Sequence, residues 1–324
     1  MRVLHPSAYP NAKNAFPLAT RKDKAGLEPG IARLVADGEA VLKVFEPAFK
    51  FLADKCNVSA VPVMNPHKRA WQAATSVGPL KKSDRIEEKS LNDYKDEKYP
   101  FAAVCDVVRA TMAFNDPGGM LGALEKLVAW DGQNVFGSAA VKYRIAKAKE
   151  LYSLNLQSLY GDVKLSLLFY LEGVPDGHVC ELQLNTVPLI AAKGSEMGHL
   201  AYEVERTLEN KWNDEHPKVA LPSLVKIEEH QARLRANASD PDVPKYGGQS
   251  AGMKGATIDD YLDLYRPLVD IMQKCNAPAR QAFDGHPASS RLIERVRALA
   301  KAVDARWEER FVNFGMWGQL DQTA

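Results

Sequence analysis

The sequence predicts a mixed α+β fold in which helices from both ends of the chain flank a β-sheet. The run 101–114 is almost continuously apolar and rich in Val and Thr, which is typical of a strand buried on both faces. From Val163 to Phe169, apolar and polar residues alternate, as in a strand with one buried face. Between Ile31 and Cys56 the apolar residues recur instead at helical spacing.

The other elements follow in order along the chain. Residues 1–25 have no periodicity and indicate an irregular arm, and Pro47 predicts a kink or break in the helix over Ile31–Cys56. The charged segment Ser83–Asn92 contains no helix breaker and predicts an exposed helix. The later elements are expected as a helix at 120–130, strands at 134–145, 163–169 and 178–186, a turn at 175–177, and helices at 188–212, 223–236 and 288–310. The chain then divides into an N-terminal arm and helix (1–60), a mixed α/β unit (61–212) and a C-terminal helical region (213–324).

The composition excludes several classes of protein. The 324 residues are 46% hydrophobic and 26% charged, which is typical of a globular chain. Lys and Arg (42) nearly balance Asp and Glu (41), so no overall charge draws the protein to nucleic acid or to an anionic membrane. The cysteines have no C-x-x-C spacing, which argues against a zinc ribbon, and no apolar run approaches the roughly 18 residues of a membrane span. We therefore expect a cytoplasmic protein with no membrane partner.

Two carboxylates lie where a buried sheet disfavours them. Asp106 falls within the apolar run 101–114 and Glu181 within the strand expected at 178–186, where an unpaired charge loses much of its hydration. Strand alternation places Gln183 on the same face as Glu181. Two carboxylates on neighbouring strands suit a Mg²⁺ ion that keeps some of its waters and binds phosphate oxygens. The alternative, which is the commoner situation, is that each carboxylate is paired with an arginine.

Basic residues form two runs. Lys81, Arg85 and Lys89 are spaced i, i+4, i+8, so a helix would align them on one face, where they could bind a polyphosphate. A second run contains Lys142, Arg144, Lys147 and Lys149. Charge runs are more often the solvated faces of helices, but two of them beside a metal candidate favour triphosphate chemistry.

A third group, His199, Tyr202 and Glu203, shares one face of the helix expected after the Glu181 strand. A core helix with a satisfied histidine is the alternative to a functional site here. The sequence contains no P-loop, dinucleotide-binding or nucleophile-elbow motif, and no H-E-x-x-H zinc motif.

Taken in order, these segments resemble the RelA/SpoT-like synthetase family over roughly residues 75 to 210. The segments are Lys81 to Lys89, Asp106-Val-Val-Arg109-Ala-Thr111, Lys142-Tyr-Arg144, Tyr160-Gly161-Asp162-Val163-Lys164-Leu165, Glu181-Leu-Gln183-Leu-Asn-Thr186 and His199-x-x-Tyr202-Glu203. The resemblance implies a nucleotidyltransferase-like mixed sheet flanked by helices. It also implies a pyrophosphokinase that uses ATP and Mg²⁺ and transfers the β,γ-pyrophosphoryl group to the 3′-hydroxyl of a nucleotide. Some relatives are toxins that modify adenine nucleotides or the 3′ end of tRNA.

The resemblance also implies roles for individual residues. Asp106 and Glu181 are similar to the residues that bind the metal or activate the attacking hydroxyl, and Gln183 completes the family's E-x-Q pattern. His199 lies on the segment that matches the helix closing the active site. Nucleotide-binding roles are implied for Lys81, Lys82, Arg85, Lys89, Arg109, Lys142, Arg144, Tyr160 and Tyr202.

Three positions depart from the family pattern. Pro79 stands where the family usually has Arg, Arg85 where it usually has Ser, and Leu159 where it usually has Gly before the tyrosine that stacks on the acceptor base. The acceptor is therefore left open between a guanine nucleotide, an adenine nucleotide and tRNA. Two further alternatives are a nucleotidyltransferase that releases pyrophosphate and a degenerate domain that binds nucleotide without turnover.

Overall fold

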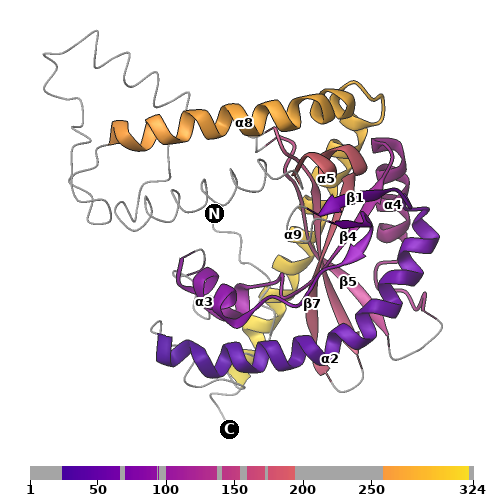
Figure 1. The fold of residues 1–324 in the computed structure, drawn as a ribbon. Coiled ribbons are helices and arrows are strands. Elements are labelled where there is room, and N and C mark those ends of the chain that lie inside the picture. Colours follow the sequence, from indigo (N-terminus) through magenta and orange to yellow (C-terminus); the bar gives the residue numbers. More distant parts are fainter. Residues whose placement is uncertain are drawn as a thin grey trace, which may run out of the picture.

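A mixed five-stranded sheet forms the centre of the computed structural model (Figure 1). The structure describes residues 24–65, 70–92, 94, 100–136, 141–153, 159–171, 174–193 and 258–320. The strands are β3 (Ser76–Val77), β4 (Val108–Phe114), β7 (Val174–Thr186), β6 (Val163–Leu171) and β5 (Lys142–Glu150), in that spatial order. Strands β4 and β7 are parallel, and the other neighbours are antiparallel. The predicted mixed α+β fold is therefore confirmed.

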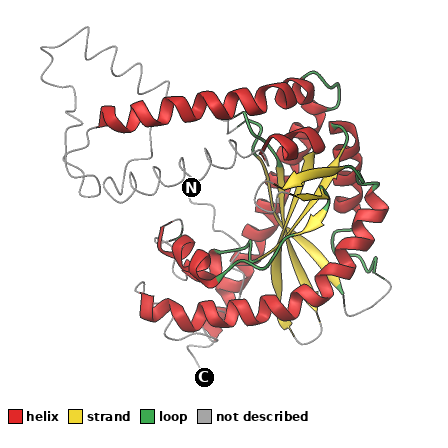
Figure 2. Cartoon of the chain, in the orientation of Figure 1, coloured by secondary structure: helices red, strands yellow, loops and turns green. Residues whose placement is uncertain are grey.

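Helices surround this sheet, and a small hairpin lies beside it (Figure 2). The helices are α2 (Lys24–Cys56), α3 (Ser83–Asn92), the 3₁₀ helix η1 (Pro100–Ala103), α4 (Pro117–Ala129), α5 (Val187–Lys193), α8 (Ile258–Asp284) and α9 (Ser289–Leu320). The hairpin consists of β1 (Pro62–Asn65) and β2 (Ala70–Ala73). None of the described helices combines the length and the apolar character that a membrane span requires.

The two faces of the sheet differ in polarity. On one face, apolar side chains such as Met112, Leu182 and Leu165 are fully or almost fully buried in a cluster that includes residues of α2 and α4. The alternate residues point to the other face, because successive side chains of a strand lie on opposite sides. This second face carries Arg109 and Glu181, both only partly buried. The same face also carries buried apolar residues such as Val179 and Leu168, so the sheet has an apolar core face and a second face of mixed polarity.

The C-terminal helices belong to the same core. Leu292 and Val296 of α9 are fully buried in the main cluster, and Phe283 of α8 stacks on Tyr152 with ring centroids 3.9 Å apart. Arg306 of α9 donates a hydrogen bond to the carbonyl oxygen of Ile145 on the edge strand β5. These contacts bind α8 and α9 to the sheet. The division of the chain into three regions stays a prediction.

The expected strand over 101–114 is wrong in its first half. Residues Pro100–Ala103 form η1, and β4 begins only at Val108. Phe101 and Val107 are fully buried all the same, because they pack in a second apolar cluster against residues of α2 and α3. An apolar run indicates burial without specifying whether a sheet or a helix provides it. Asp106 therefore lies in the segment that leads into β4, outside the strand itself.

Other boundaries also differ from expectation. The strand expected at 134–145 is β5 at Lys142–Glu150, so the second basic run lies within a strand. The turn expected at 175–177 lies inside β7, where Gly177 has a φ of +75°, in the left-handed region that favours glycine. Helix α8 was not predicted, and its two prolines, Pro267 and Pro278, obscure the helical pattern. The helix expected at 188–212 corresponds to α5 as far as Lys193, and its expected remainder and the helix expected at 223–236 lie outside the described residues.

Candidate active site

A pair of backbone hydrogen bonds places the first basic run beside the start of β4. The amide of Gly78 donates to the carbonyl of Arg109 at 2.9 Å, and the amide of Lys81 donates to the carbonyl of Val107 at 3.0 Å. The chain from β3 to α3 thus runs antiparallel along β4 and past Asp106. A Cβ atom on Gly78 would lie 3.2 Å from Cγ of Arg109, so glycine allows this close approach.

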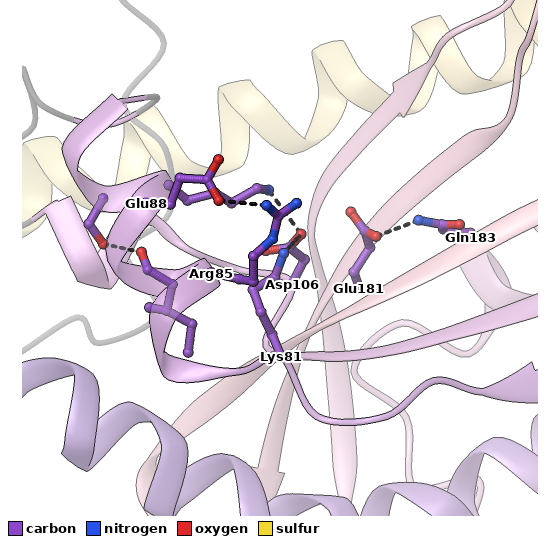
Figure 3. Close-up of polar contacts among 9 residues, drawn as sticks. Lys81, Arg85, Glu88, Asp106, Glu181 and Gln183 are labelled. Atoms are coloured by element: carbon purple, nitrogen blue, oxygen red, sulfur yellow. Dashed lines mark hydrogen bonds and ion pairs between the residues drawn. The ribbon is translucent and has the colours of Figure 1, made fainter. Parts of the chain in front are cut away.

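Asp106 accepts two ion pairs at one oxygen. Nζ of Lys81 lies 2.8 Å from Oδ2 of Asp106, and Nζ of Lys89 lies 2.9 Å from the same oxygen (Figure 3). The side chains of Lys81 and Asp106 are only 9% and 14% exposed. Burial alone would raise the pKa of Asp106, but the charges of Lys89 and Lys81 outweigh it and lower the pKa to about 2. The carboxylate is therefore ionised at neutral pH.

The two lysines respond differently to this environment. Burial lowers the pKa of Lys81, and the charge of Asp106 only partly opposes that effect. For Lys89, burial also acts to lower the pKa, but Asp106 and other negative groups, including Glu181, act more strongly and raise it. The negative charges of Asp106 and Glu181 therefore both stabilise the ammonium form of Lys89.

The second oxygen of Asp106 is the unusual feature of this cluster. Oδ1 is buried and has no hydrogen-bond partner among the described residues. A buried carboxylate oxygen without a partner is unfavourable, because it has lost its water without gaining a donor. An oxygen in this state is suited to a cation, which would supply the missing interaction.

Glu181 lies on the second face of the sheet, on β7, and is held by its neighbour on the same face. Nε2 of Gln183 donates to Oε1 of Glu181 at 2.6 Å. In the parallel register, Glu181 is the Cα partner of Arg109 on β4. Figure 3 shows the carboxylates of Asp106 and Glu181 on the same side of the sheet. The alternative to a metal site was an arginine partner for each carboxylate, but the structure pairs Asp106 with two lysines and Glu181 with an amide.

These residues fit a divalent cation of one type. Among the described residues, no group of three or more His, Cys, Asp or Glu side chains is arranged to hold a metal ion. Mg²⁺ is usually held by one or two carboxylates together with waters and substrate phosphates, and Asp106 and Glu181 are the candidates for such a donor set. The unpartnered Oδ1 of Asp106 is the atom best suited to it.

The other two residues of the first basic run, Arg85 and Lys82, make contacts of their own. Nη1 of Arg85 lies 2.6 Å from Oε2 of Glu88, one turn further along α3, in a pair that is more than one third exposed on both sides. Lys82 precedes α3 and is exposed, and its carbonyl accepts hydrogen bonds from the amides of Arg85 and Ile86. The expected row along one helix is therefore wrong in part: Lys89 contacts Asp106 from α3, Lys81 contacts it from the segment before α3, and Arg85 pairs within its own helix.

Tyr160 is the centre of a separate polar network. Its hydroxyl donates to Oδ2 of Asp162 at 2.9 Å and accepts hydrogen bonds from Nδ2 of Asn185 at 3.1 Å and Nζ of Lys193 at 3.2 Å. Asp162 is fully buried and Asn185 almost fully buried. The preceding residue, Leu159, has a φ of +55°, in the left-handed region that favours glycine. This network fixes the orientation of the Tyr160 ring.

In the second basic run, the expected residues Lys142 and Arg144 make contacts away from Asp106, and Lys147 is the member whose charge acts near it. Nζ of Lys142 lies 5.5 Å from the ring centroid of Tyr170, and the guanidinium of Arg144 packs against Gly132. Both lie at the start of the edge strand β5, and neither contact joins them to Asp106. Lys147, further along β5, acts on Cys105: burial raises the pKa of that thiol to about 12, and the charge of Lys147 opposes the rise.

Sequence reasoning therefore missed part of the site. Lys193, Asn185 and Asp162 were not among the expected site residues, although all three contact Tyr160. Asp162 and Asn185 carried a usable signal, since each is a polar residue at the boundary of an apolar strand. Lys193 had no such signal. His199 and Tyr202, which were expected to close the site, lie outside the described residues.

Comparison with known proteins gives likenesses of fold. No family model matches the sequence, and no curated protein matches it. The structure is similar to small alarmone synthetase 1 from Bacillus subtilis bound to its product pppGpp, with a TM-score of 0.38 and 13% identity over 64% of this chain and 98% of that one. It is also similar to a GTP pyrophosphokinase family protein from Streptococcus pneumoniae, with a TM-score of 0.36 and 10% identity over 74% of this chain and 96% of that one. Small alarmone synthetase 2 from Bacillus subtilis gives a TM-score of 0.33 and 12% identity, over 63% of this chain and 90% of that one. Identities at this level concern the fold alone, so the roles of individual residues depend on contacts within this chain.

Proposed function

We propose that the protein is a nucleotide pyrophosphokinase that transfers the β,γ-pyrophosphoryl group of ATP to the 3′-hydroxyl of a second nucleotide. The observation that carries this proposal is the buried Oδ1 of Asp106, which has no partner among the described residues and lies within a cluster of cations. Such an arrangement is suited to bind a cation together with polyphosphate oxygens. The motifs that resemble the RelA/SpoT-like family point in the same direction. A cytoplasmic location belongs to the same proposal.

In the reaction, the acceptor's 3′-oxygen forms a bond to the β-phosphorus of ATP, and the bond from that phosphorus to the α-bridging oxygen breaks. AMP leaves, and the proton of the acceptor hydroxyl passes to a base. Glu181 is the candidate base, since Gln183 fixes one of its oxygens and orients the carboxylate. Mg²⁺ held by Asp106 and Glu181 would neutralise charge on the transferred group.

In this proposal, the lysines bind the phosphate groups of ATP and neutralise their charge. Phosphoryl-type transfer relies on positioning and charge neutralisation more than on covalent chemistry, so several cations near the metal are needed. Lys81 and Lys89 lie at hydrogen-bond distance from Asp106. A triphosphate entering with its cation would compete with Asp106 for these ammonium groups. Arg109, beside Glu181 in the sheet, is a third candidate for the same role.

The experiment is to incubate the purified protein with labelled ATP, Mg²⁺ and one acceptor at a time: GDP, GTP, ADP or tRNA. The expected result is AMP together with a pyrophosphorylated acceptor, identified by mass spectrometry. Release of pyrophosphate with a nucleoside monophosphate on the acceptor would identify a nucleotidyltransferase instead. Binding of ATP without turnover of any acceptor would support the degenerate, nucleotide-binding alternative.

Glu181→Gln tests the assigned base. We expect it to abolish transfer while changing the free energy of unfolding by less than about 2 kcal/mol, because the amide keeps the size and the contact with Gln183. The matched control is Glu125→Gln, on the exposed side of α4, which should leave transfer unchanged. Full activity of Glu181→Gln would remove this residue from the mechanism.

A further inference from the structure

Lys193, the last described residue of α5, covers the ring of Tyr160. Its Nζ lies 4.6 Å from the ring centroid and also donates a hydrogen bond to the Tyr160 hydroxyl at 3.2 Å. Residue Lys193 is exposed as a whole, while its ammonium end lies among these protein groups. A base cannot stack on the covered face of Tyr160 until that ammonium moves.

The ring is also held in place through its hydroxyl group by other residues. The Tyr160 hydroxyl donates to Asp162 and accepts from Asn185, both of which are buried. A phenol has one donor hydrogen and two acceptor lone pairs, so these two bonds and that of Lys193 use its full capacity. Loss of the Lys193 contact leaves the bonds to Asp162 and Asn185 intact. The cation can therefore leave without releasing the ring.

The charges around Lys193 favour such a departure when an anion is present. Loss of water lowers the pKa of Lys193, and the positive charges of Lys164 and Arg109 lower it further, while Asp162 and Glu181 act in the opposite direction. Three cations thus share a small region with two carboxylates. A phosphate group there would relieve the repulsion among the cations and offer Lys193 a stronger partner than an aromatic ring.

We propose that Lys193 makes the acceptor site selective for nucleotides that carry a phosphate. The phosphate draws the ammonium away from Tyr160 and binds it, and the uncovered ring then stacks on the base. An uncharged nucleoside must displace the ammonium without compensation. This inference rests on the proposed function, because Tyr160 is taken as the residue that stacks on the acceptor base.

Binding measurements without ATP test this selectivity, since no transfer is needed for them. Affinities of GDP, guanosine, ADP and adenosine are measured by calorimetry for the wild-type protein, Lys193→Met and Lys193→Arg. In Lys193→Met we expect nucleoside diphosphates to bind about ten-fold more weakly, because one charge-assisted hydrogen bond is lost. Nucleosides should bind as well as before or about two- to five-fold more tightly, because no cation covers the ring.

Two variants serve as controls. Lys193→Arg keeps a cation that can both cover the ring and bind phosphate, so the preference for diphosphates should persist. Lys55→Met removes another ammonium that lies over an aromatic ring, 5.7 Å from the centroid of Phe51 on α2, and should change neither affinity. Equal loss of nucleotide and nucleoside binding in Lys193→Met would overturn the proposal, as would no change in either or the absence of wild-type binding.

The outcomes separate this inference from the proposed function. If transfer occurs but Lys193→Met keeps the wild-type preference for diphosphates, the function stands and the role of Lys193 is wrong. If no acceptor is pyrophosphorylated but the affinities change as expected, Lys193 still selects phosphate-bearing ligands, and the protein is a nucleotide-binding domain.

Discussion

The ammonium of Lys81 and the carboxylate of Asp106 form an ion pair of 2.8 Å in which both side chains are largely withdrawn from water. Lys89 adds a second positive charge at the same carboxylate oxygen. The single negative charge of Asp106 therefore balances the positive charges of both lysines in a partly buried cluster. The stability of this region depends on Asp106, because without it the two ammonium groups would repel each other at short range.

Asp106→Asn should destabilise the protein by about 3 kcal/mol, since it leaves the buried ammonium of Lys81 and the partly buried one of Lys89 without this counter-charge. The free energy of unfolding from urea titration at pH 7 measures this loss. The more exposed pair of Arg85 and Glu88 provides the comparison, because solvent screens it more strongly. Glu88→Gln should change the same free energy by less than about 1 kcal/mol. Similar effects of the two substitutions would contradict the importance of burial at Asp106.

His178 should make the protein less stable in mild acid. It is fully buried on β7, where burial lowers its pKa from 6.5 to about 4, although Asp37 of α2 acts to raise it. Between these two values the unfolded chain binds a proton that the folded protein does not. Stability is therefore present above pH 6.5 and is lost as the pH falls toward 4. From pH 7.5 to pH 5 the contribution of His178 falls by about 2 kcal/mol.

The measurement is the free energy of unfolding of the wild type and of His178→Leu at both pH values. Other groups titrate in both proteins, so the difference between the two pH dependences isolates the histidine. We expect the stability of His178→Leu to fall by about 2 kcal/mol less than that of the wild type. Parallel pH dependences would show that His178 is protonated as readily in the folded protein as in the unfolded chain.

Those parts of the fold with a local pattern could be predicted. The alternation in Val163 to Phe169 identified β6, and the charged, breaker-free segment Ser83–Asn92 is α3 with the same bounds. The helical spacing of Lys81 and Lys89 does not by itself explain why they meet at Asp106, because Lys81 precedes α3 and only Lys89 lies on it. The identity of their partner depends on tertiary structure, because the segment around Asp106 is buried partly against α2 and α3 and partly, through Cys105, against residues of the sheet.

The acceptor side of the candidate site was harder to predict. Lys193 is a single lysine in the short helix α5. It becomes a candidate site residue only through its contact with Tyr160, which lies on a separate loop 33 residues earlier. Helix α8 reaches the same region through Arg280, whose Nη1 donates to the carbonyl of Tyr152 at 2.8 Å. Neither relationship leaves a pattern in the local sequence, so only the assembled fold reveals them.

Leu159 should tolerate glycine better than an ordinary half-buried leucine. Its φ of +55° is unfavourable for a residue with a branched side chain by about 1 kcal/mol, and this strain offsets the greater flexibility of glycine in the unfolded chain. We expect Leu159→Gly to change the free energy of unfolding by less than about 1 kcal/mol. Leu151, also half-buried but without a positive φ, is the matched control, and Leu151→Gly should lose about 2 kcal/mol or more. A large loss for Leu159→Gly would mean that its side-chain contacts outweigh the backbone strain.

Gly161 should be the least replaceable glycine near Tyr160, because its neighbour has no room to move. A Cβ atom at Gly161 would lie 2.7 Å from Cε1 of Tyr152, which is fully buried and stacked on Phe283 of α8. Gly161→Ala should destabilise the protein by about 2 to 3 kcal/mol, since the ring must leave its stacked position to make space. Gly122 in α4 is exposed, and nothing lies within 4 Å of a Cβ placed there, so Gly122→Ala should stabilise the protein by about 1 kcal/mol. Thermal unfolding of both variants tests this contrast, and the near-ultraviolet circular dichroism of Gly161→Ala should change as the Tyr152 and Phe283 rings separate. An unaltered spectrum with unaltered stability would mean that the loop moves in place of the ring. Close packing of Gly161 against Tyr152 would then not be needed to hold the loop of Tyr160 against α8.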